Sequence, residues 1–204
     1  ISIEGPDGSG KSTQIENIKE FFHDKNMDII FTREPGGTPI GERIRGIILD
    51  RKCSEMDPMT EAMLYAAARA QHVAQVIRPA LEKGKIVICD RFVDSSIAYQ
   101  GYGRKLGEVV ASINHFAVKE CMPDMTILLK LDPTVGKHRI SEDQQDRLEA
   151  EREAFHQEVY KGYLELEKNF PDRIVGIDAD RGINEIKVDI YEKLEKILSN
   201  RCSQ

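Results

Sequence analysis

The sequence predicts an α/β fold, a three-layer, doubly wound arrangement in which a parallel five-stranded sheet carries helices on both faces. Short apolar runs alternate along the chain with longer stretches of helical periodicity, which is the order of elements that builds a parallel sheet. A length of 204 residues allows one full hydrophobic core and is too short for two typical domains. We therefore expect a single domain over residues 1–204.

The elements follow one another without a repeat or a linker. The expected strands are residues 1–4, 27–32, 85–90, 125–131 and 173–178. They are mostly apolar runs, as strands covered on both faces require. Helical spacing predicts helices from Lys11 onward and over residues 40–49, about 58–81, 92–100, 109–121, about 148–170 and 183–198, with a short one after Pro133. Thr38 and Asp57 are suited to cap two of these helices.

A glycine-rich stretch between the first strand and the first helix fits the phosphate-binding pattern G-x-x-x-x-G-K-[ST]. The expected nucleotide-binding residues are Gly5, Pro6, Asp7, Gly8, Ser9, Gly10, Lys11, Ser12 and Thr13. Glycines let main-chain N–H groups approach phosphate oxygens, and the helix N-terminus adds partial positive charge. Lys11 is placed for the β- and γ-phosphates, and the Ser12 hydroxyl for Mg²⁺. The alternative is an ordinary glycine-rich turn, but the flanking strand and helix favour a nucleoside triphosphate site.

Charged residues also end the next two predicted strands. Asp90 and Arg91 directly follow the apolar run 85–89, and Arg33 follows the run 27–32. Ligands of open α/β sheets bind outside the carboxyl ends of the strands. Asp90 is therefore a candidate for holding the Mg²⁺ ion on the side opposite the Ser12 hydroxyl. Arg91 is a candidate for binding a second phosphate through two N–H groups.

The predicted helix over about 58–81 places polar side chains on one face. Tyr65 and Arg69 are four residues apart, and His72 follows three residues later. The residues alone favour a structural interpretation, in which Tyr65 packs on the core and Arg69 extends to water. His72 is interpreted as a surface histidine or one whose hydrogen bonds are satisfied internally.

The segment of about residues 137–149 begins with a polar stretch that has almost no apolar side chains and contains Arg139 and Arg147. It is either a solvated loop or a mobile lid that closes over phosphates.

Composition excludes several classes of function. The chain has 29 Lys and Arg against 35 Asp and Glu, so no basic surface indicates nucleic-acid binding. The four cysteines are far apart, which gives neither a zinc-site pattern nor a disulfide framework. Cys89 closes an apolar run and is expected to be a buried hydrophobe. The sequence shows no signal peptide and no apolar span of membrane-crossing length, so we expect a cytoplasmic protein without membrane partners.

Four elements in this order resemble the thymidylate kinase family. They are the phosphate-binding loop, Thr32-Arg33-Glu34-Pro35-Gly36-Gly37-Thr38, Asp90-Arg91-Phe92 and Asp146-Arg147-Leu148-Glu149. The resemblance covers nearly the whole chain. It implies a nucleotide-kinase fold with a lid, and Mg²⁺-dependent transfer of the γ-phosphoryl of ATP to dTMP, which yields dTDP on the way to dTTP. It also implies a homodimer.

The resemblance further implies roles for particular residues. The substrate-binding residues would be Asp7, Arg33, Tyr65, Arg69, Arg91, Ser96, Tyr99 and Gln100. Asp7 would bind the sugar 3′-hydroxyl, and Arg91 and Arg33 the acceptor phosphate. In this family an aromatic side chain at the position of Tyr65 stacks on thymine, and an arginine at the position of Arg69 bonds a thymine carbonyl. The last three residues would line the base and the sugar. Ser96 stands where some relatives have Asn, and residues 140–142 where relatives often have more arginines.

The catalytic residues that the resemblance implies are Lys11, Arg91, Arg139 and Arg147. In one branch of the family an arginine follows the carboxylate of the phosphate-binding loop, but here that position is Gly8. The developing charge on the transferred phosphoryl still needs a further cation. We favour Arg139 for this role, and expect Arg147 partly to anchor the chain that returns from the lid.

Two alternatives to a thymidylate kinase stay open from the sequence. One is a P-loop kinase that acts on a different nucleoside monophosphate. The other is a nucleotide-dependent switch or a catalytically inactive binding protein, which would not need two arginines that converge on an acceptor phosphate.

Overall fold

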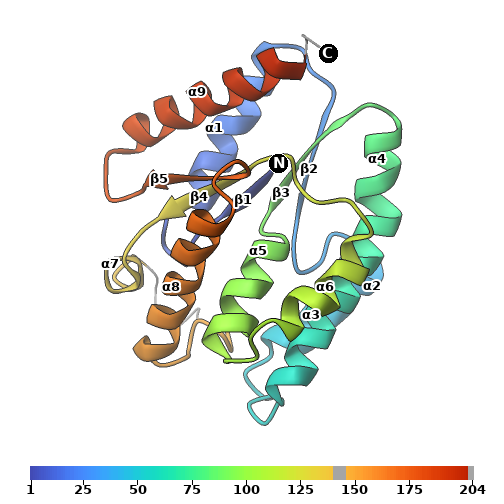
Figure 1. The fold of residues 1–204 in the computed structure, drawn as a ribbon, viewed down its shortest axis with the longest axis vertical. Helices are drawn as coiled ribbons and strands as arrows, with labels where there is room; N and C mark the ends of the chain where they lie inside the picture. Colours follow the sequence, from blue (N-terminus) through green and yellow to red (C-terminus); the bar gives the residue numbers. More distant parts are fainter. Residues whose placement is uncertain (140–145, 202–204) are drawn as a thin grey trace.

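The computed structural model describes residues 1–139 and 146–201. Its centre is a five-stranded sheet with the order β2-β3-β1-β4-β5, in which all neighbouring strands are parallel (Figure 1). The strands are β1 (Ser2–Glu4), β2 (Ile29–Arg33), β3 (Ile86–Asp90), β4 (Thr126–Lys130) and β5 (Ile174–Asp178). The predicted α/β class and the five predicted strands are confirmed, with small differences at the strand ends.

Helices connect the strands and cover them. They are α1 (Lys11–Asp24), α2 (Pro39–Leu49), α3 (Pro58–His72), the π-helical η1 (Val73–Ile77), α4 (Arg78–Glu82), α5 (Val93–Ser96), the π-helical η2 (Ile97–Gly103), α6 (Val109–Val118), α7 (Pro133–Lys137), α8 (Glu153–Asn169) and α9 (Ile183–Arg201). Both predicted caps are confirmed. Thr38 Oγ1 accepts the Gly41 N–H at 2.9 Å, and Asp57 Oδ1 accepts the Met59 N–H at 2.8 Å.

Some predicted helix boundaries are wrong. Helix α8 begins at Glu153 instead of residue 148, because the Asp146 carboxylate accepts the N–H groups of Leu148 and Glu149 and forms a turn there. Helix α6 ends at Val118, because the following Lys119 has a left-handed backbone with φ of 45°. The predicted helix over 58–81 is an uninterrupted run of α3, η1 and α4, with a π-helical middle.

The sheet separates two apolar layers. On one face, α1 and α9 lie side by side (Figure 1) and pack on Ile127 and Leu129 of β4. On the other face, α8 and η2 pack against each other, and Leu128 of the same strand joins their cluster. Alternate residues of one strand thus serve opposite layers, which explains why the strands are mostly apolar.

All five strands end at the same edge of the sheet, since they are parallel. There β1 leads into the loop before α1, and Arg33 and Asp90, at the ends of β2 and β3, are register partners. The side chains predicted for phosphates and metal therefore share one edge.

The predicted lid is described only at its two ends. Residues Ile140, Ser141 and Glu142, where the family pattern has more arginines, lie outside the described residues. Arg139 on one side and the turn at 146–149 on the other are described. Within 1–139 and 146–201, none of the helices combines the length and the apolarity needed to cross a membrane.

Candidate active site

A cavity of about 690 Å³ opens at the carboxyl edge of the sheet. It is bounded by the loop before α1, the ends of β2 and β3, α3, η2, Arg139 and the turn at 146–149. The predicted site residues that line it are Asp7, Gly8, Ser9, Gly10, Lys11, Ser12, Thr13, Arg33, Tyr65, Arg69, Asp90, Arg91, Ser96, Tyr99, Gln100 and Arg139. Gly5, Pro6 and Arg147 do not line it. The structure thus brings together residues that are up to 132 positions apart, from Asp7 to Arg139.

The phosphate-binding loop is held tightly against the chain that follows β4. Gly8 has φ of 77°, and a Cβ atom there would lie 2.3 Å from the carbonyl oxygen of Gly136 in α7. Gly136 is equally confined, since its own Cβ would lie 2.3 Å from the carbonyl oxygen of Asp7. Glycine is therefore required at both positions, and a side chain cannot be added at position 8 while α7 stays in place.

Lys11 is folded back on the loop. Its Nζ donates to the carbonyl oxygens of Gly5 at 3.0 Å and Pro6 at 2.8 Å, and lies 3.9 Å from Asp7 Oδ1. Burial, with a smaller effect from the Arg91 charge, lowers the pKa of Lys11 to about 8. The cation is therefore poorly compensated without a ligand, and bound phosphate would stabilise its charged form.

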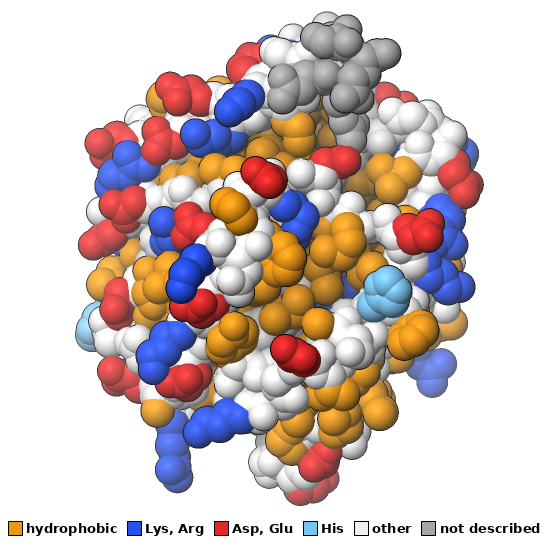
Figure 2. Space-filling view, viewed as in Figure 1, with side chains coloured by type: hydrophobic (Ala, Val, Ile, Leu, Met, Phe, Trp, Pro, Cys, Tyr) orange, Lys and Arg blue, Asp and Glu red, His pale blue; other side chains and the backbone are white. Residues whose placement is uncertain are grey.

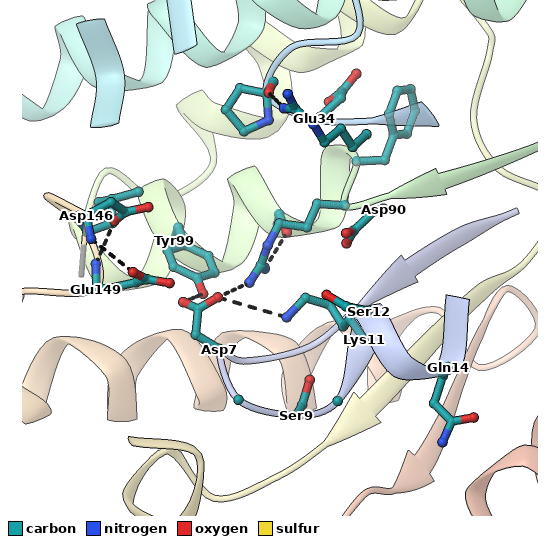
Figure 3. Close-up of a pocket in the computed structure, with 18 of the residues that line it drawn as sticks. Asp7, Ser9, Lys11, Ser12, Gln14, Glu34, Asp90, Tyr99, Asp146 and Glu149 are labelled. Carbon is teal, nitrogen blue, oxygen red and sulfur yellow. Dashed lines mark hydrogen bonds and ion pairs between the residues drawn. The ribbon is translucent and has the colours of Figure 1, made fainter. Parts of the chain in front are cut away.

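The Asp7 carboxylate of the loop is surrounded by polar side chains, and Figure 3 shows Lys11 and Tyr99 directed toward it. The Arg91 guanidinium donates to Asp7, to the Gly5 carbonyl at 3.1 Å, and to Ser95 Oγ at 3.1 Å. Tyr99 donates its hydroxyl to Asp7 Oδ2 at 2.9 Å. Burial opposes ionisation of Asp7, but Arg91, Lys11 and the Tyr99 hydrogen bond outweigh it and lower its pKa to about 2. Arg91 has φ of 62°, a costly conformation for a residue with a side chain and one often found at functional sites.

Three buried polar atoms have no hydrogen-bond partner within the described chain. They are Ser9 Oγ, Asp90 Oδ1 and Gln100 Oε1, and all three residues line the cavity. Buried polar atoms are normally paired, so unpaired ones at a cavity indicate positions that a ligand satisfies. They lie at the loop, at the end of β3 and on η2, and therefore mark separate parts of the cavity.

The far end of the cavity is formed by α3 and η2. Arg69 is only 1% exposed, so the interpretation that it extends to water is wrong. It donates to Glu34 Oε2 at 2.7 Å, Ser96 Oγ at 2.9 Å and the Phe92 carbonyl oxygen at 3.0 Å, and also to the Asn114 side chain. A guanidinium has five N–H groups, and these four bonds leave one that is not used within the described residues.

His72 is buried and satisfied internally, so of the two interpretations the surface one is wrong. Its Nδ1 lies 2.9 Å from Glu34 Oε1, and its Nε2 lies 2.6 Å from Thr32 Oγ1. These bonds hold Glu34, which in turn holds Arg69. Tyr65, one turn before Arg69, is half-buried at the cavity wall.

The two lid arginines differ in their surroundings. Arg139 has a side chain 42% exposed, lines the cavity, and donates to the Gly8 carbonyl oxygen at 3.4 Å. Arg147 is 8% exposed, and it donates to Glu61 Oε2 at 2.6 Å and the Ile48 carbonyl oxygen at 2.7 Å. The structure thus places Arg147 as an anchor of the returning chain and Arg139 beside the phosphate-binding loop.

Sequence reasoning missed several buried acids around the site. Glu4 precedes the loop and accepts from the Phe92 N–H at 2.7 Å and Ser95 Oγ at 2.5 Å, and burial together with nearby Asp94 raises its pKa to about 7. Glu61 is fully buried and accepts a hydrogen bond from the Gln100 side chain. The spacing of Glu61, Tyr65 and Arg69, four residues apart in turn, could have placed Glu61 on the same helix face.

Comparisons with known proteins identify the family of the chain. The family model described as thymidylate kinase matches residues 3–190. A thymidylate kinase of Pediococcus pentosaceus is 51% identical over 205 residues, with 98% of each chain covered. One of Halalkalibacterium halodurans is 46% identical over 203 residues, covering 98% of this chain and 97% of the relative. The crystal structure of thymidylate kinase from Ehrlichia chaffeensis superposes with a TM-score of 0.77 at 31% identity, covering 95% of this chain and 96% of that one. The chain therefore belongs to the thymidylate kinase family.

Proposed function

We propose that the cavity holds ATP over the phosphate-binding loop and dTMP between Arg91 and α3, with Arg139 as the cation that stabilises the transferred phosphoryl. The reaction, transfer of the γ-phosphoryl of ATP to dTMP, is that of the family to which the chain belongs. The observation that carries the assignment of residues is the set of unpaired buried atoms at the loop, at β3 and on η2.

On the donor side, main-chain N–H groups of the loop and Lys11 would bind the triphosphate. Lys11 would exchange the carbonyl oxygens of Gly5 and Pro6 for phosphate oxygens. The residues fit Mg²⁺, because Asp90 offers an unpaired buried carboxylate oxygen and the Ser12 hydroxyl is exposed at the cavity. Bound there, Mg²⁺ would neutralise charge on the phosphates of ATP.

On the acceptor side, Arg91 and Arg33 would bind the 5′-phosphate of dTMP. Arg33 is exposed at the cavity and is held by Glu42, whose carboxylate accepts from it at 2.9 Å. Asp7 is ionised and acts only as an acceptor, which suits the sugar 3′-hydroxyl. Phosphate binding would compete with Asp7 for Arg91 and so free a carboxylate oxygen for the sugar.

At the base end of the cavity, one side chain would stack on the thymine ring and others would form hydrogen bonds with its edge. Tyr65 would stack on the thymine ring, and the unused N–H of Arg69 would donate to a thymine carbonyl. Ser96 is committed to Arg69 as an acceptor and therefore acts on the base mainly by placing that arginine. Gln100 offers an unpaired oxygen to the ring edge.

A homodimer and a cytoplasmic location are part of this proposal. Exposed hydrophobic side chains lie on α3 and on α2 and α6, the two helices that pack against it, and Figure 2 shows such side chains over α3 and α6. They are Ile40, Ile47, Met63, Val109 and Phe116, the last 76% exposed. Exposed apolar side chains on neighbouring helices support an interface between copies of the chain. Sedimentation equilibrium at several concentrations measures the molar mass in solution, which for a homodimer is twice that of one chain.

One assay tests the proposed function as a whole. The protein is incubated with ATP, Mg²⁺ and a panel of nucleoside monophosphates, and the diphosphates formed are measured. Preference for dTMP supports the proposal, and loss of product on omitting Mg²⁺ supports the metal assignment. Preference for another acceptor indicates a different monophosphate kinase. Binding of ATP without any phosphorylated product indicates a switch or an inactive binding protein.

We expect ATP binding to take up protons near pH 8. The pKa of Lys11 is lowered to about 8, and the negative charge of the triphosphate will raise it. Lys11, partly neutral at pH 8, therefore gains up to about half a proton on binding. ATP affinity should fall as the pH rises through this range. Titration calorimetry at pH 8 in two buffers of different ionisation enthalpy measures the uptake, and Lys11→Arg, which stays charged, should abolish it. Equal heats in both buffers for the unmodified protein would contradict the prediction.

We expect Tyr99 to select deoxyribose. In the proposed arrangement its ring lies beneath the sugar, where a 2′-hydroxyl would be crowded and would lack a partner. An unsatisfied buried hydroxyl costs about 1–3 kcal/mol, so Tyr99→Ala should reduce the preference for dTMP over its ribose counterpart about tenfold to a hundredfold. Tyr99→Phe is the matched control, because it keeps the ring and loses only the hydrogen bond to Asp7. The ratio of the two kcat/KM values is the measurement. An unchanged ratio in a folded Tyr99→Ala protein would remove this role.

A further inference from the structure

A fully buried carboxylate lies behind the base end of the cavity. Glu61, on α3, is 0% exposed and does not itself line the cavity. Its Oε1 accepts the Gln100 Nε2–H at 2.9 Å, and its Oε2 accepts Arg147 Nη2–H at 2.6 Å. Arg104 donates to both oxygens, with Nη2 3.0 Å from Oε2. One acid thus joins α3, η2 and the chain that returns from the lid.

Two arginines hold this carboxylate in one orientation. Arg104 also pairs with Glu151 at 2.6 Å, and Arg147 also donates to the Ile48 carbonyl oxygen at 2.7 Å. Each guanidinium is thus tied at a second point, which restricts its rotation. A carboxylate between two such groups is in turn restricted, because rotation would break charge-assisted hydrogen bonds in a buried site.

The orientation of Glu61 determines which end of the Gln100 amide faces the ligand. A primary amide has a donor end and an acceptor end, and every contact of Glu61 described above uses it as an acceptor. The NH₂ group of Gln100 must therefore point to Glu61. The other end, Oε1, is buried and has no partner among the described residues, and Gln100 lines the cavity. Gln100 therefore presents a hydrogen-bond acceptor to the cavity, and its donor group is used by Glu61.

We propose that Glu61 is a positioning residue for base selection: it turns the oxygen of Gln100 into the cavity, where that oxygen accepts the ring N–H of thymine. Thymine carries N–H at ring position 3, whereas cytosine carries an unprotonated nitrogen acceptor there. An acceptor on the wall therefore favours thymine and repels cytosine. The inference rests on the proposed placement of dTMP beside η2, and it adds a residue that does not contact the substrate.

The substitution Glu61→Gln tests it directly. The two arginines will take the carbonyl oxygen of the new amide, which leaves its NH₂ group facing Gln100. Gln100 will then turn its own oxygen toward position 61 and its NH₂ group into the cavity. The matched substrates are dTMP and 5-methyl-dCMP, which share the methyl group and differ at ring positions 3 and 4. We expect the ratio of their kcat/KM values to fall about tenfold to a hundredfold, mainly through KM. The KM for ATP should be unchanged.

Glu151→Gln is the matched control. Glu151 also pairs with Arg104, but within the described chain it has no hydrogen bond to Gln100 or Arg147. Its substitution should leave the substrate ratio unchanged. An equal fall in both variants would overturn the proposal, since the effect would then come from the charge around Arg104.

A double-mutant cycle tests whether Glu61 acts through Gln100. In a Gln100→Ala background, Glu61→Gln should have no further effect on the ratio. A further fall of the same size would overturn the proposal. Should Glu61→Gln fail to fold, Glu61→Asp replaces it, because it keeps the charge that the arginines need and withdraws the carboxylate from Gln100. Its ratio should also fall, and an unchanged ratio in folded Glu61→Asp would overturn the inference. Failure of the unmodified protein to phosphorylate dTMP would instead contradict the proposed function.

Discussion

Lys11→Ala should abolish phosphoryl transfer while the protein stays folded. Phosphoryl transfer depends on positioning and on stabilisation of charge, and we propose that Lys11 is the loop cation that binds the transferred group. The contacts of Lys11 indicate that it contributes little to the stability of the fold. The two loop carbonyl oxygens lose a donor, at a cost of about 1–3 kcal/mol. Removing a buried cation whose pKa is lowered returns part of that cost.

Turnover with dTMP and a thermal unfolding curve are the two measurements for Lys11→Ala. The unfolding temperature should change by only a few degrees, and binding of dTMP alone should persist, because Arg91 and Arg69 are retained. Near-normal turnover by a folded Lys11→Ala protein would show that the loop does not bind the transferred phosphate.

Arg139→Ala should reduce kcat by roughly 10³–10⁵, the range for an arginine that stabilises the phosphoryl transition state. Arg139 borders the cavity beside the Gly8 carbonyl oxygen, and position 8 carries no side chain. Its only described ion pair is an exposed one with Asp180 at 3.5 Å, which contributes little to stability. The arginine is therefore available to move toward the phosphates. Affinity for dTMP should be nearly unchanged.

Arg147→Ala is the informative comparison. Arg147 is buried against Glu61, so its removal leaves a buried carboxylate with one fewer partner and should cost about 3–5 kcal/mol of stability. The two variants should thus separate, with Arg139→Ala losing kcat and Arg147→Ala losing stability. Preserved kcat with weakened dTMP binding in Arg139→Ala would make Arg139 a substrate clamp and transfer the catalytic role to Arg147.

Patterns local in sequence predict much of this molecule. The alternation of apolar runs and helical spacing is sufficient for the α/β class, because each strand is covered on both faces. The loop at residues 5–12 and the acid that ends the third strand suffice to predict that these residues lie together, since parallel strands end at one edge.

Contacts between distant segments could not be predicted in this way. Arg147 lies in a recognisable motif, but its direction depends on Ile48 and Glu61, which lie 99 and 86 residues earlier. The use of Arg69 similarly depends on Glu34 and Asn114, from two other segments. Periodicity placed Arg69 on a helix face, and only the packing of that helix against other segments determines which side chains it meets.

The close contact between Gly8 and Gly136 constrains how this enzyme can evolve. A lineage that acquired an arginine at position 8 would first need α7 to withdraw, because a side chain there collides with the Gly136 carbonyl oxygen. That same oxygen accepts the N–H of Arg139 at 3.0 Å, so a withdrawn α7 would carry Arg139 away from the loop. With Arg139 as the proposed catalytic cation, this backbone cannot combine it with an arginine at position 8. A change between the two arrangements would therefore require position 8 and α7 to change together.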